Sequence, residues 1–196
     1  MGPIWLCART SSHTADIVED CPLTSLITGT QQDELFNEAS KDRWADVVLV
    51  MNSDIVLFDD FYDALKRTFD EFGDERFLFV GARYDLVGTG EKEARTAFDS
   101  TYFRDLRKSS KVANAVLHSY GGVDYYGWKP VGDPYTAAVG GAIPPFTYGK
   151  GKADNWVVKV AGDNGVHVVD ASLAVRAIHY THSYTDGGAA PMKEVN

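Results

Sequence analysis

Short apolar runs alternate along this chain with longer segments in which apolar residues recur at helical spacing. The clearest run, residues 47–51, is apolar throughout, which is typical of a strand buried on both faces of a sheet. It ends in the polar residues Asn52, Ser53 and Asp54, which form either a turn or part of a site. The pattern predicts further strands in the sequences IWLCA, TSLIT, RFLFVGARYD, GGVDYYGWKP and VHVVDAS.

Four segments carry a helical pattern: QQDELFNEASK, DDFYDALKRTFDEFG, EKEARTAFDSTYFRDLRK and NWVVKVAGDNG. In the second, Phe61, Leu65, Phe69 and Phe72 are spaced to share one face. Asp59 or Asp60 is expected to cap its start, and Gly73 is expected to end it. The Gly- and Pro-rich sequence AVGGAIPPFTYGKGKADNW predicts a loop.

This order of strands and helices predicts an α/β sandwich in which one sheet lies between helices. The length of 196 residues suits a single domain, which we expect to span residues 1–184. Residues 185–196 are expected to form a flexible tail.

Composition narrows the possible partners. The formal net charge of −9 argues against a non-specific nucleic-acid binder, which normally has a basic face. No stretch is long and apolar enough to predict a membrane span, and the first residues lack a signal-peptide pattern. Cys7 and Cys21 form no disulfide framework, so a cytoplasmic location is the default expectation.

Polar residues gather at the predicted ends of strands and starts of helices. They are Asn52 to Asp54, Arg83, Asp85, Asp124, Asp154, Asn155, His179 and His182. An α/β fold brings such ends to one edge of the sheet, where ligands bind. A carboxylate beside a diphosphate requires a divalent cation between the two anions, and an imidazole is a better ligand for Mn²⁺ than for Mg²⁺. A second carboxylate there could accept a proton from a hydroxyl group.

These segments resemble, in order, those of microbial and viral proteins of the GT-A glycosyltransferase type. The resemblance is seen in the segments VMNSDIVLFDDFYDAL, FLFVGARYDL, SYGGVDYYGW, IPPFTYGKGKADNWVV, VVDAS and AIHYTHSY. It covers the chain from about Thr28 to Tyr184. The resemblance implies a three-layer α/β sandwich with a central mixed sheet. It also implies a metal-dependent enzyme that transfers a sugar from a nucleotide-diphosphate donor, UDP-linked, to a carbohydrate hydroxyl.

The resemblance also implies roles for individual residues. Asp54 matches the metal-binding acid of a shortened DXD motif, with His179 or His182 as a further ligand of Mn²⁺ or Mg²⁺. Asn52 and Ser53 would lie near the sugar or ribose, and Arg83 near phosphate. Arg9 and Thr10 are candidates for contact with uridine or diphosphate. Asp154 would be the catalytic base, and Asp124 the reserve candidate or an acceptor contact.

Each role has a simpler structural alternative. Asp154 would also suit a helix N-cap, Arg83 an ion pair with Asp85, and Asp124 a turn. The aromatic residues near these motifs would either stack on sugar rings or belong to the core; they are Tyr125, Tyr126, Trp128 and Trp156. At the level of function, the alternatives are a non-catalytic module that binds carbohydrate or nucleotide and a metal-dependent phosphohydrolase.

Overall fold

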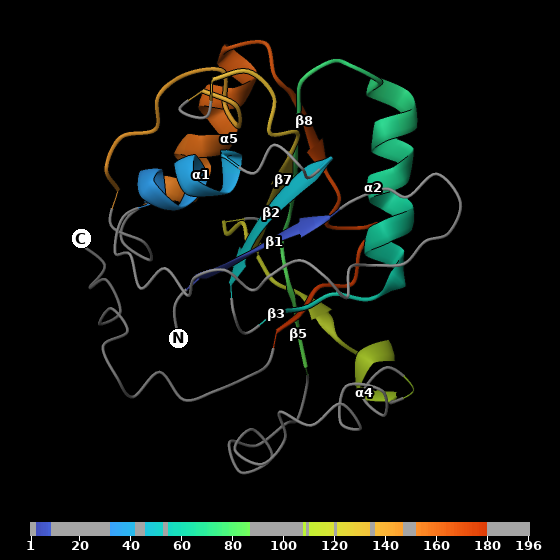
Figure 1. The fold of residues 1–196 in the computed structure, drawn as a ribbon. Helices are drawn as coiled ribbons and strands as arrows, with labels where there is room; N and C mark the ends of the chain where they lie inside the picture. The colour runs from blue at the N-terminus through green and yellow to red at the C-terminus, as the bar shows by residue number, and fades with distance from the viewer. Residues whose placement is uncertain are drawn as a thin grey trace, which may run out of the picture.

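The computed structural model describes residues 3–8, 32–41, 46–52, 55–86, 108, 110–119, 121–133, 136–146 and 152–179. In this part of the chain the fold is mixed α/β, with two mixed sheets and a small number of helices (Figure 1). The α/β class expected from the sequence is therefore confirmed, whereas the single sheet is a correction.

The larger sheet has the strand order β1-β2-β7-β4-β8. Its members are β1 (Pro3–Ala8), β2 (Val47–Asn52), β7 (Tyr125–Trp128), β4 (Phe77–Gly81) and β8 (His167–Asp170). Antiparallel pairing joins β1 to β2, β2 to β7 and β7 to β4, while β4 and β8 are parallel. Because β7 runs antiparallel between β2 and β4, its first residue lies beside the last residues of both neighbours.

The smaller sheet has the order β3-β9-β5-β6 and consists of two-residue strands. They are β3 (Ile55–Val56), β9 (Ile178–His179), β5 (Tyr84–Asp85) and β6 (Val116–Leu117), with the short helix α4 (Ser110–Ala113) nearby. Figure 1 shows β3, β5 and α4 below the larger sheet. The chain passes from one sheet to the other directly after β2 and again directly after β4.

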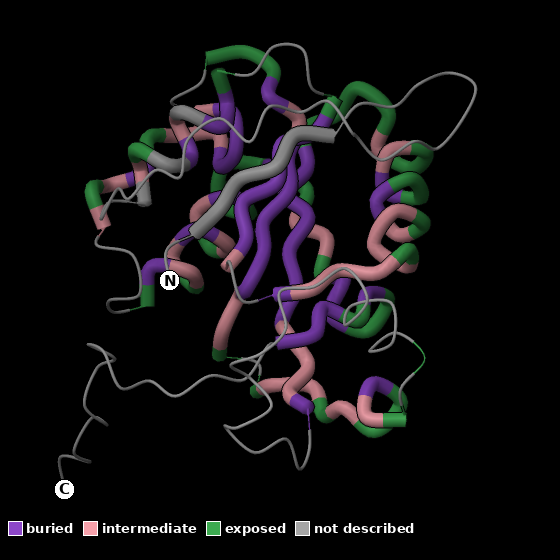
Figure 2. The backbone as a smooth tube through the Cα atoms, turned by 60° about the horizontal axis from the view of Figure 1, so that its bottom comes forward, coloured by how far each residue is buried: buried purple, intermediate pink, exposed green. Residues whose placement is uncertain are grey.

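Helices pack on both faces of the larger sheet. Helices α1 (Gln32–Ser40) and α5 (Ala153–Asp163) lie on one side, and α2 (Asp59–Phe72) lies on the other (Figure 1). Strand β2 shows why both faces need to be covered. Successive side chains of a strand point to opposite faces of the sheet, and the side chains of β2 are apolar on both. Val48 and Val50 join the core beneath α1 and α5, whereas Leu49 packs toward α2. Strands β2, β4 and β7 are almost entirely buried, and Figure 2 shows buried strands at the centre of the molecule in purple.

The aromatic residues of β7 belong to the core. Tyr125, Tyr126 and Trp128 are at most 1% exposed, so stacking on a sugar ring is excluded for these three in this structure. The ring of Phe36 in α1 stacks on Trp128, and the indole N–H of Trp128 donates to Ser40 Oγ at 2.9 Å. This contact fixes α1 against the sheet and gives the buried indole N–H of Trp128 an acceptor.

Most strands and helices were predicted at the correct places. The predicted helix in DDFYDALKRTFDEFG is α2, and Gly73 ends it in a positive-φ conformation, as expected. The predicted cap is wrong, because Phe58 occupies the N-cap position without a side-chain hydrogen bond and Asp59 and Asp60 lie in the first turn. The sequence TSLIT, most of the helix expected at residues 91–108 and the tail at residues 185–196 lie outside the described residues.

The strand predicted in RFLFVGARYD is interrupted after Gly81. Ala82 and Arg83 leave the ladder, and the chain re-enters a sheet at Tyr84. The backbone N–H of Tyr84 then bonds to Ala177 O in the segment before β9. One apolar run thus supplies strands to both sheets, and its polar residue Arg83 lies between them.

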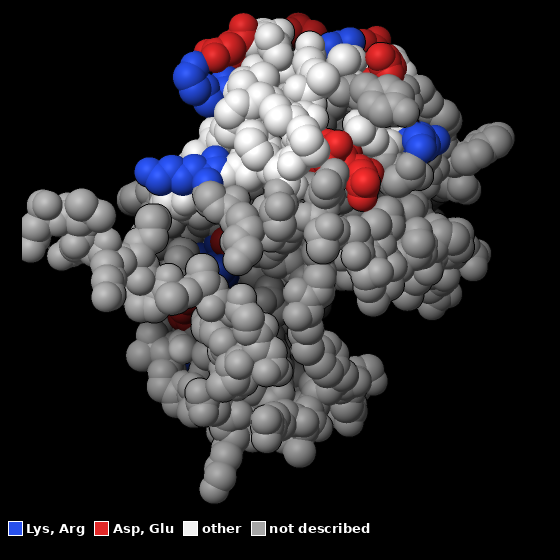
Figure 3. Space-filling model, turned by 90° about the vertical axis from the view of Figure 1, so that its left-hand side faces the viewer, with Lys and Arg blue, Asp and Glu red and all other residues white. Residues whose placement is uncertain are grey.

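Among the helices that the structure describes, none has the length and apolar character needed to cross a membrane. Figure 3 views the side that carries α1 and α5. The described acidic and basic side chains seen there are interspersed rather than separated by sign.

Candidate functional site

The candidate site lies where the two sheets meet. Strands β2 and β4 end there, and β7 begins. The backbone N–H of Asn52 donates to Asp124 O at 3.0 Å, and that of Asp124 donates to Gly81 O at 2.9 Å. These backbone bonds hold Asn52 and Asp124, which are 72 positions apart in the sequence, side by side.

Asp124 is the buried centre of this site and is 3% exposed. Its Oδ1 accepts hydrogen bonds from Asn52 Nδ2 and Arg83 Nη1, both at 3.0 Å, and its Oδ2 accepts one from Arg83 N at 3.0 Å. Burial alone would lower the pKa of the Arg83 guanidinium, but Asp124 and Asp85 outweigh it and raise that pKa. The buried carboxylate is therefore matched by a charged partner and by polar N–H groups.

Asp85 joins three groups that can carry positive charge. Its Oδ1 accepts from Arg83 Nε at 3.1 Å and lies 3.2 Å from His179 Nδ1, while its Oδ2 lies 2.6 Å from His118 Nδ1. Partial burial would raise the pKa of Asp85, but the contacts with His118 and Arg83 prevail and lower it. Asp85 therefore stays ionised and ties β5 to β9 and to the residue that follows β6.

Asp154 lies in the first turn of α5, beside the segment that leads into β7. Its Oδ1 accepts from the backbone N–H of Asn155 at 2.9 Å, and its Oδ2 accepts from that of Val123 at 3.3 Å. Asn155 Nδ2 donates to Gly121 O at 3.3 Å. The alternative that Asp154 is an N-cap is wrong, because Lys152 occupies that position. Instead, Asp154 connects α5 to the residue before Asp124.

A further set of contacts fixes the backbone around Arg83. The N–H of Ala82 donates to Ser172 Oγ at 2.9 Å, and this hydroxyl donates to Asp170 Oδ1 at 2.6 Å. The hydroxyl of Tyr84 donates to Ser172 O at 3.0 Å. The residues on both sides of Arg83 are therefore anchored to the turn after β8, which restricts where the guanidinium can reach.

Of the residues predicted to form a site, the structure brings together Asn52, Arg83, Asp124, Asp154 and His179. The other candidates, Arg9, Thr10, Ser53, Asp54 and His182, lie outside the described residues. One register observation bears on Asp54: Ile55, the next residue in the chain, pairs with His179 across β3 and β9. The structural alternative for Arg83, an ion pair with Asp85, is confirmed. The carboxylate of Asp124 holds Asn52 and Arg83 by hydrogen bonds.

Sequence reasoning missed His118 and Ser172. His118 follows the two-residue strand β6, and it contacts an aspartate 33 positions earlier in the chain. Ser172 follows β8 and bonds to Ala82, 90 positions earlier. Ser172 ends the segment VVDAS and His118 directly precedes SYGGVDYYGW, but the partners of both lie on distant strands, so sequence spacing could not reveal their contacts.

The described residues contain no group of three or more His, Cys, Asp or Glu side chains arranged to hold a metal ion. They do contain imidazoles that contact a carboxylate, namely His118, His167 and His179. A carboxylate on one nitrogen of an imidazole fixes the tautomer that presents the other nitrogen to a metal. Asp85 occupies that position for His179 Nδ1.

Comparisons with known proteins return no match. No model of a protein family fits the chain, and no curated protein or solved structure is significantly similar to it. We therefore infer function from the site itself and from the order of motifs in the sequence.

Proposed function

We propose that this protein is a metal-dependent glycosyltransferase of the GT-A type that moves a sugar from a nucleotide-diphosphate donor, UDP-linked, to a hydroxyl group of a carbohydrate acceptor. The observation that carries the proposal is convergence. Asn52, Arg83, Asp124, Asp154 and His179 come from five separate sequence motifs and meet at one junction of two sheets. The packing of helices on both faces of a mixed sheet is compatible with the three-layer sandwich of that fold.

In the proposed reaction, Asp154 is the general base. Its carboxylate takes the proton of the acceptor hydroxyl while that oxygen forms a bond to the anomeric carbon of the donor sugar. The bond from this carbon to the diphosphate oxygen breaks, and its electron pair leaves with the diphosphate. The two backbone N–H groups on Asp154 orient the carboxylate and keep it in place before the acceptor arrives.

Arg83 and Asn52 have positioning roles in this proposal. Arg83 Nη2 makes no hydrogen bond within the described residues, whereas Nη1 and Nε are held by Asp124 and Asp85. This leaves one guanidinium nitrogen for a phosphate oxygen. Asp124 accepts three hydrogen bonds. We therefore propose that it orients Arg83 and Asn52 and does not transfer a proton.

A divalent cation, Mn²⁺ or Mg²⁺, would stabilise the negative charge that develops on the departing diphosphate. We propose Asp54 and His179 as its ligands, with His182 as a further candidate. The support is the pairing of Ile55 with His179, together with the contact of Asp85 on His179 Nδ1.

Calorimetric titration with UDP in the presence of Mn²⁺ tests the binding part of the proposal. Asp54→Ala should remove the metal-dependent component of UDP binding, while Asp70→Asn on the exposed side of α2 should leave it unchanged. Affinity for Mn²⁺ and UDP that is the same in Asp54→Ala and the wild type would exclude Asp54 from the site.

The catalytic part is tested with Asp154→Asn after a screen of donor sugars has found the substrate. The amide keeps an oxygen for one backbone N–H but cannot act as a base, so transfer should fall by about two to four powers of ten. UDP affinity should stay near the wild-type value. Full activity of Asp154→Asn would reject the assignment. Direct displacement at the anomeric carbon inverts its configuration, so a product with retained configuration would reject this mechanism.

A non-catalytic module that binds carbohydrate or nucleotide is the second candidate. The sequence NSD contains a single acidic residue where a full DXD motif has two, which favours weaker metal binding. Binding of UDP or an oligosaccharide without transfer from any tested donor would support this candidate over the enzyme.

A further inference from the structure

A pocket of about 310 Å³ lies between α2 and the turn that follows β8, and none of the proposed transferase residues lines it. Its volume is at the lower end of the range of small-molecule sites, about 300 to 1,000 Å³. On the side of α2, residues spaced by three and four positions form the wall, so they share one helix face. They are Asp60, Asp63, Ala64, Arg67 and Thr68.

The opposite wall is largely apolar. Phe79 of β4 lines the pocket together with Val169, Ala171 and Ala174, and Asp170 adds a carboxylate at the end of β8. The lining therefore combines three carboxylates and one guanidinium with small apolar side chains. A ligand that fits it needs both polar ends and an apolar body.

Asp60 carries the first sign that the pocket binds a ligand. Its Oδ2 accepts from the backbone N–H of Arg176 at 3.0 Å, but its Oδ1 is buried and has no hydrogen-bond partner among the described residues. A buried carboxylate oxygen without a donor is costly. An ammonium group in the pocket would supply the missing donor.

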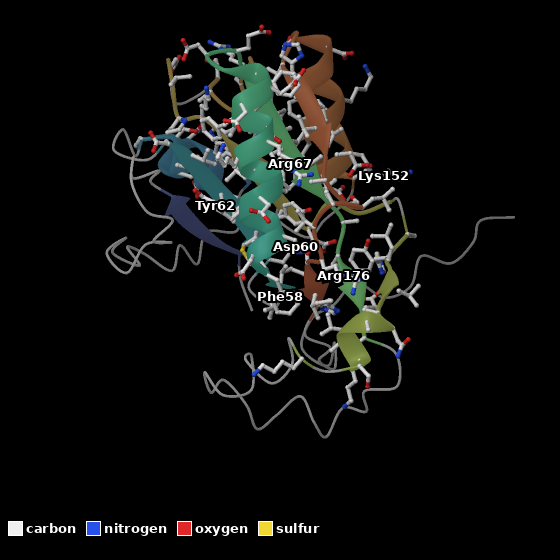
Figure 4. The ribbon with its side chains drawn as sticks, turned by 90° about the vertical axis from the view of Figure 1, so that its right-hand side faces the viewer. Phe58, Asp60, Tyr62, Arg67, Lys152 and Arg176 are labelled. Atoms are coloured by element: carbon white, nitrogen blue, oxygen red, sulfur yellow. The ribbon has the colours of Figure 1, made fainter. Side chains whose placement is uncertain are left out.

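Arg67 is the second indication that the pocket binds a ligand. Lys66 and Asp70 are four positions apart on α2 and form an ion pair at 2.5 Å. Asp63 and Arg67 have the same spacing and both line the pocket, yet within the described residues neither is in an ion pair. Figure 4 shows Asp60 near the lower end of α2 and Arg67 higher along the helix. The guanidinium is thus placed to receive an anionic group in the pocket.

A second buried polar group without a partner among the described residues lies next to the pocket. Tyr125 is fully buried, its ring contacts that of Phe79, and its hydroxyl has no hydrogen-bond partner among the described residues. Burial raises the pKa of this hydroxyl, and the charges of Asp170 and Asp60 raise it further. The hydroxyl therefore stays protonated, and this end of the pocket is negative and favours a cation.

We propose that this pocket binds a small zwitterion, with its ammonium group between Asp60 and Asp170 and its anionic group at Arg67. The seven-residue separation of Asp60 and Arg67 corresponds to roughly 10 Å along the helix axis, which sets the length of the ligand. The apolar chain between the two charges lies against Phe79 and Ala174. This site is independent of the proposed sugar transfer.

A suitable probe is 6-aminohexanoate, with hexylamine and hexanoate as analogues that each lack one charge. Binding is measured from the NMR shifts of the Ala171 and Ala174 methyl groups. We expect saturable shifts with 6-aminohexanoate, and affinities for both analogues at least about tenfold weaker, the effect of losing one charge-assisted hydrogen bond. Equal binding of hexylamine, or no shift with 6-aminohexanoate, would overturn the proposal.

Two variants locate the charges. Asp60→Asn keeps an oxygen for the N–H of Arg176, and Arg67→Gln changes an exposed side chain, so the fold should be kept in both. Each should weaken 6-aminohexanoate binding at least about tenfold. Lys66→Gln, on the outer side of α2, is the matched control and should bind as the wild type does. Variants that bind as tightly as this control would show that the shifts arise elsewhere.

Discussion

At the scale of single residues, Asp124 determines whether the site is assembled. Removing its carboxylate in Asp124→Ala leaves the Arg83 guanidinium and the Asn52 amide partly buried without their acceptor. We expect a loss of about 3 to 5 kcal/mol in the free energy of unfolding, the usual cost of breaking a buried ion pair. Urea denaturation measures it, and Asp124→Asn, which keeps one oxygen, should lose less. A loss below 1 kcal/mol in Asp124→Ala would contradict the structural role.

Tyr125 offers the opposite case, a buried hydroxyl whose removal should not harm stability. Tyr125→Phe should leave the free energy of unfolding at pH 7 unchanged or raise it by up to about 1 kcal/mol, because its hydroxyl has no hydrogen-bond partner in the described part of the chain. The matched control is Tyr84→Phe, which loses the bond to Ser172 O and should cost about 1 kcal/mol.

The same residue predicts an alkaline effect. In the folded protein, burial raises the pKa of Tyr125 above its ordinary value near 10, so its ionisation favours the unfolded chain. The contribution of neutral Tyr125 is complete below pH 10 and is lost as the pH rises above that value. Stability measured from about pH 9 to 11 should therefore fall less steeply in Tyr125→Phe than in the wild type. Identical slopes would show that the hydroxyl is solvated in the folded state.

At the scale of elements, two glycines test how helices end. Gly73 ends α2 at φ 53°, and a Cβ there would meet no atom within 4 Å, so any cost of Gly73→Ala comes from the backbone. We expect a loss of about 1 kcal/mol. Gly162 lies within α5, also with open space around it, and Gly162→Ala should gain about 0.5 to 1 kcal/mol. Thermal unfolding of both variants measures these shifts, and shifts of the same sign would contradict the assignment.

At the scale of the whole molecule, one carboxylate adds side-chain contacts to the backbone pairing of the smaller sheet. Asp85 connects β5 with His179 of β9 and with His118 after β6, and these strands have only two residues each. Its pKa is lowered in the folded protein, so its contribution to stability is present above the ordinary carboxylate value near 4 and is lost as the pH falls below it. Acid titration of stability from about pH 5 to 2 should be shallower in Asp85→Asn than in the wild type. A variant with the wild-type acid transition would show that these contacts add no stability.

The sequence by itself determined the α/β class and the location of most elements, because these depend on local periodicity. The apolar run of β2 and the apolar stripe of α2 can be recognised from the sequence without knowing which elements pack against them. The motifs also indicated Asn52, Arg83, Asp124, Asp154 and His179 as candidates, since polar side chains at strand ends interrupt an otherwise apolar pattern.

Only the tertiary structure decided which of these residues touch and what their partners are. The division of the expected single sheet into two, the burial of Tyr125 and Trp128, and the contacts of His118 and Ser172 all depend on strands that pair across dozens of residues. Local periodicity cannot encode such pairing, because the partner of a strand is chosen by long-range packing and register. The pocket beside α2 has the same origin: spacing places Asp60 and Arg67 on one helix face, but the turn after β8 closes the space between them.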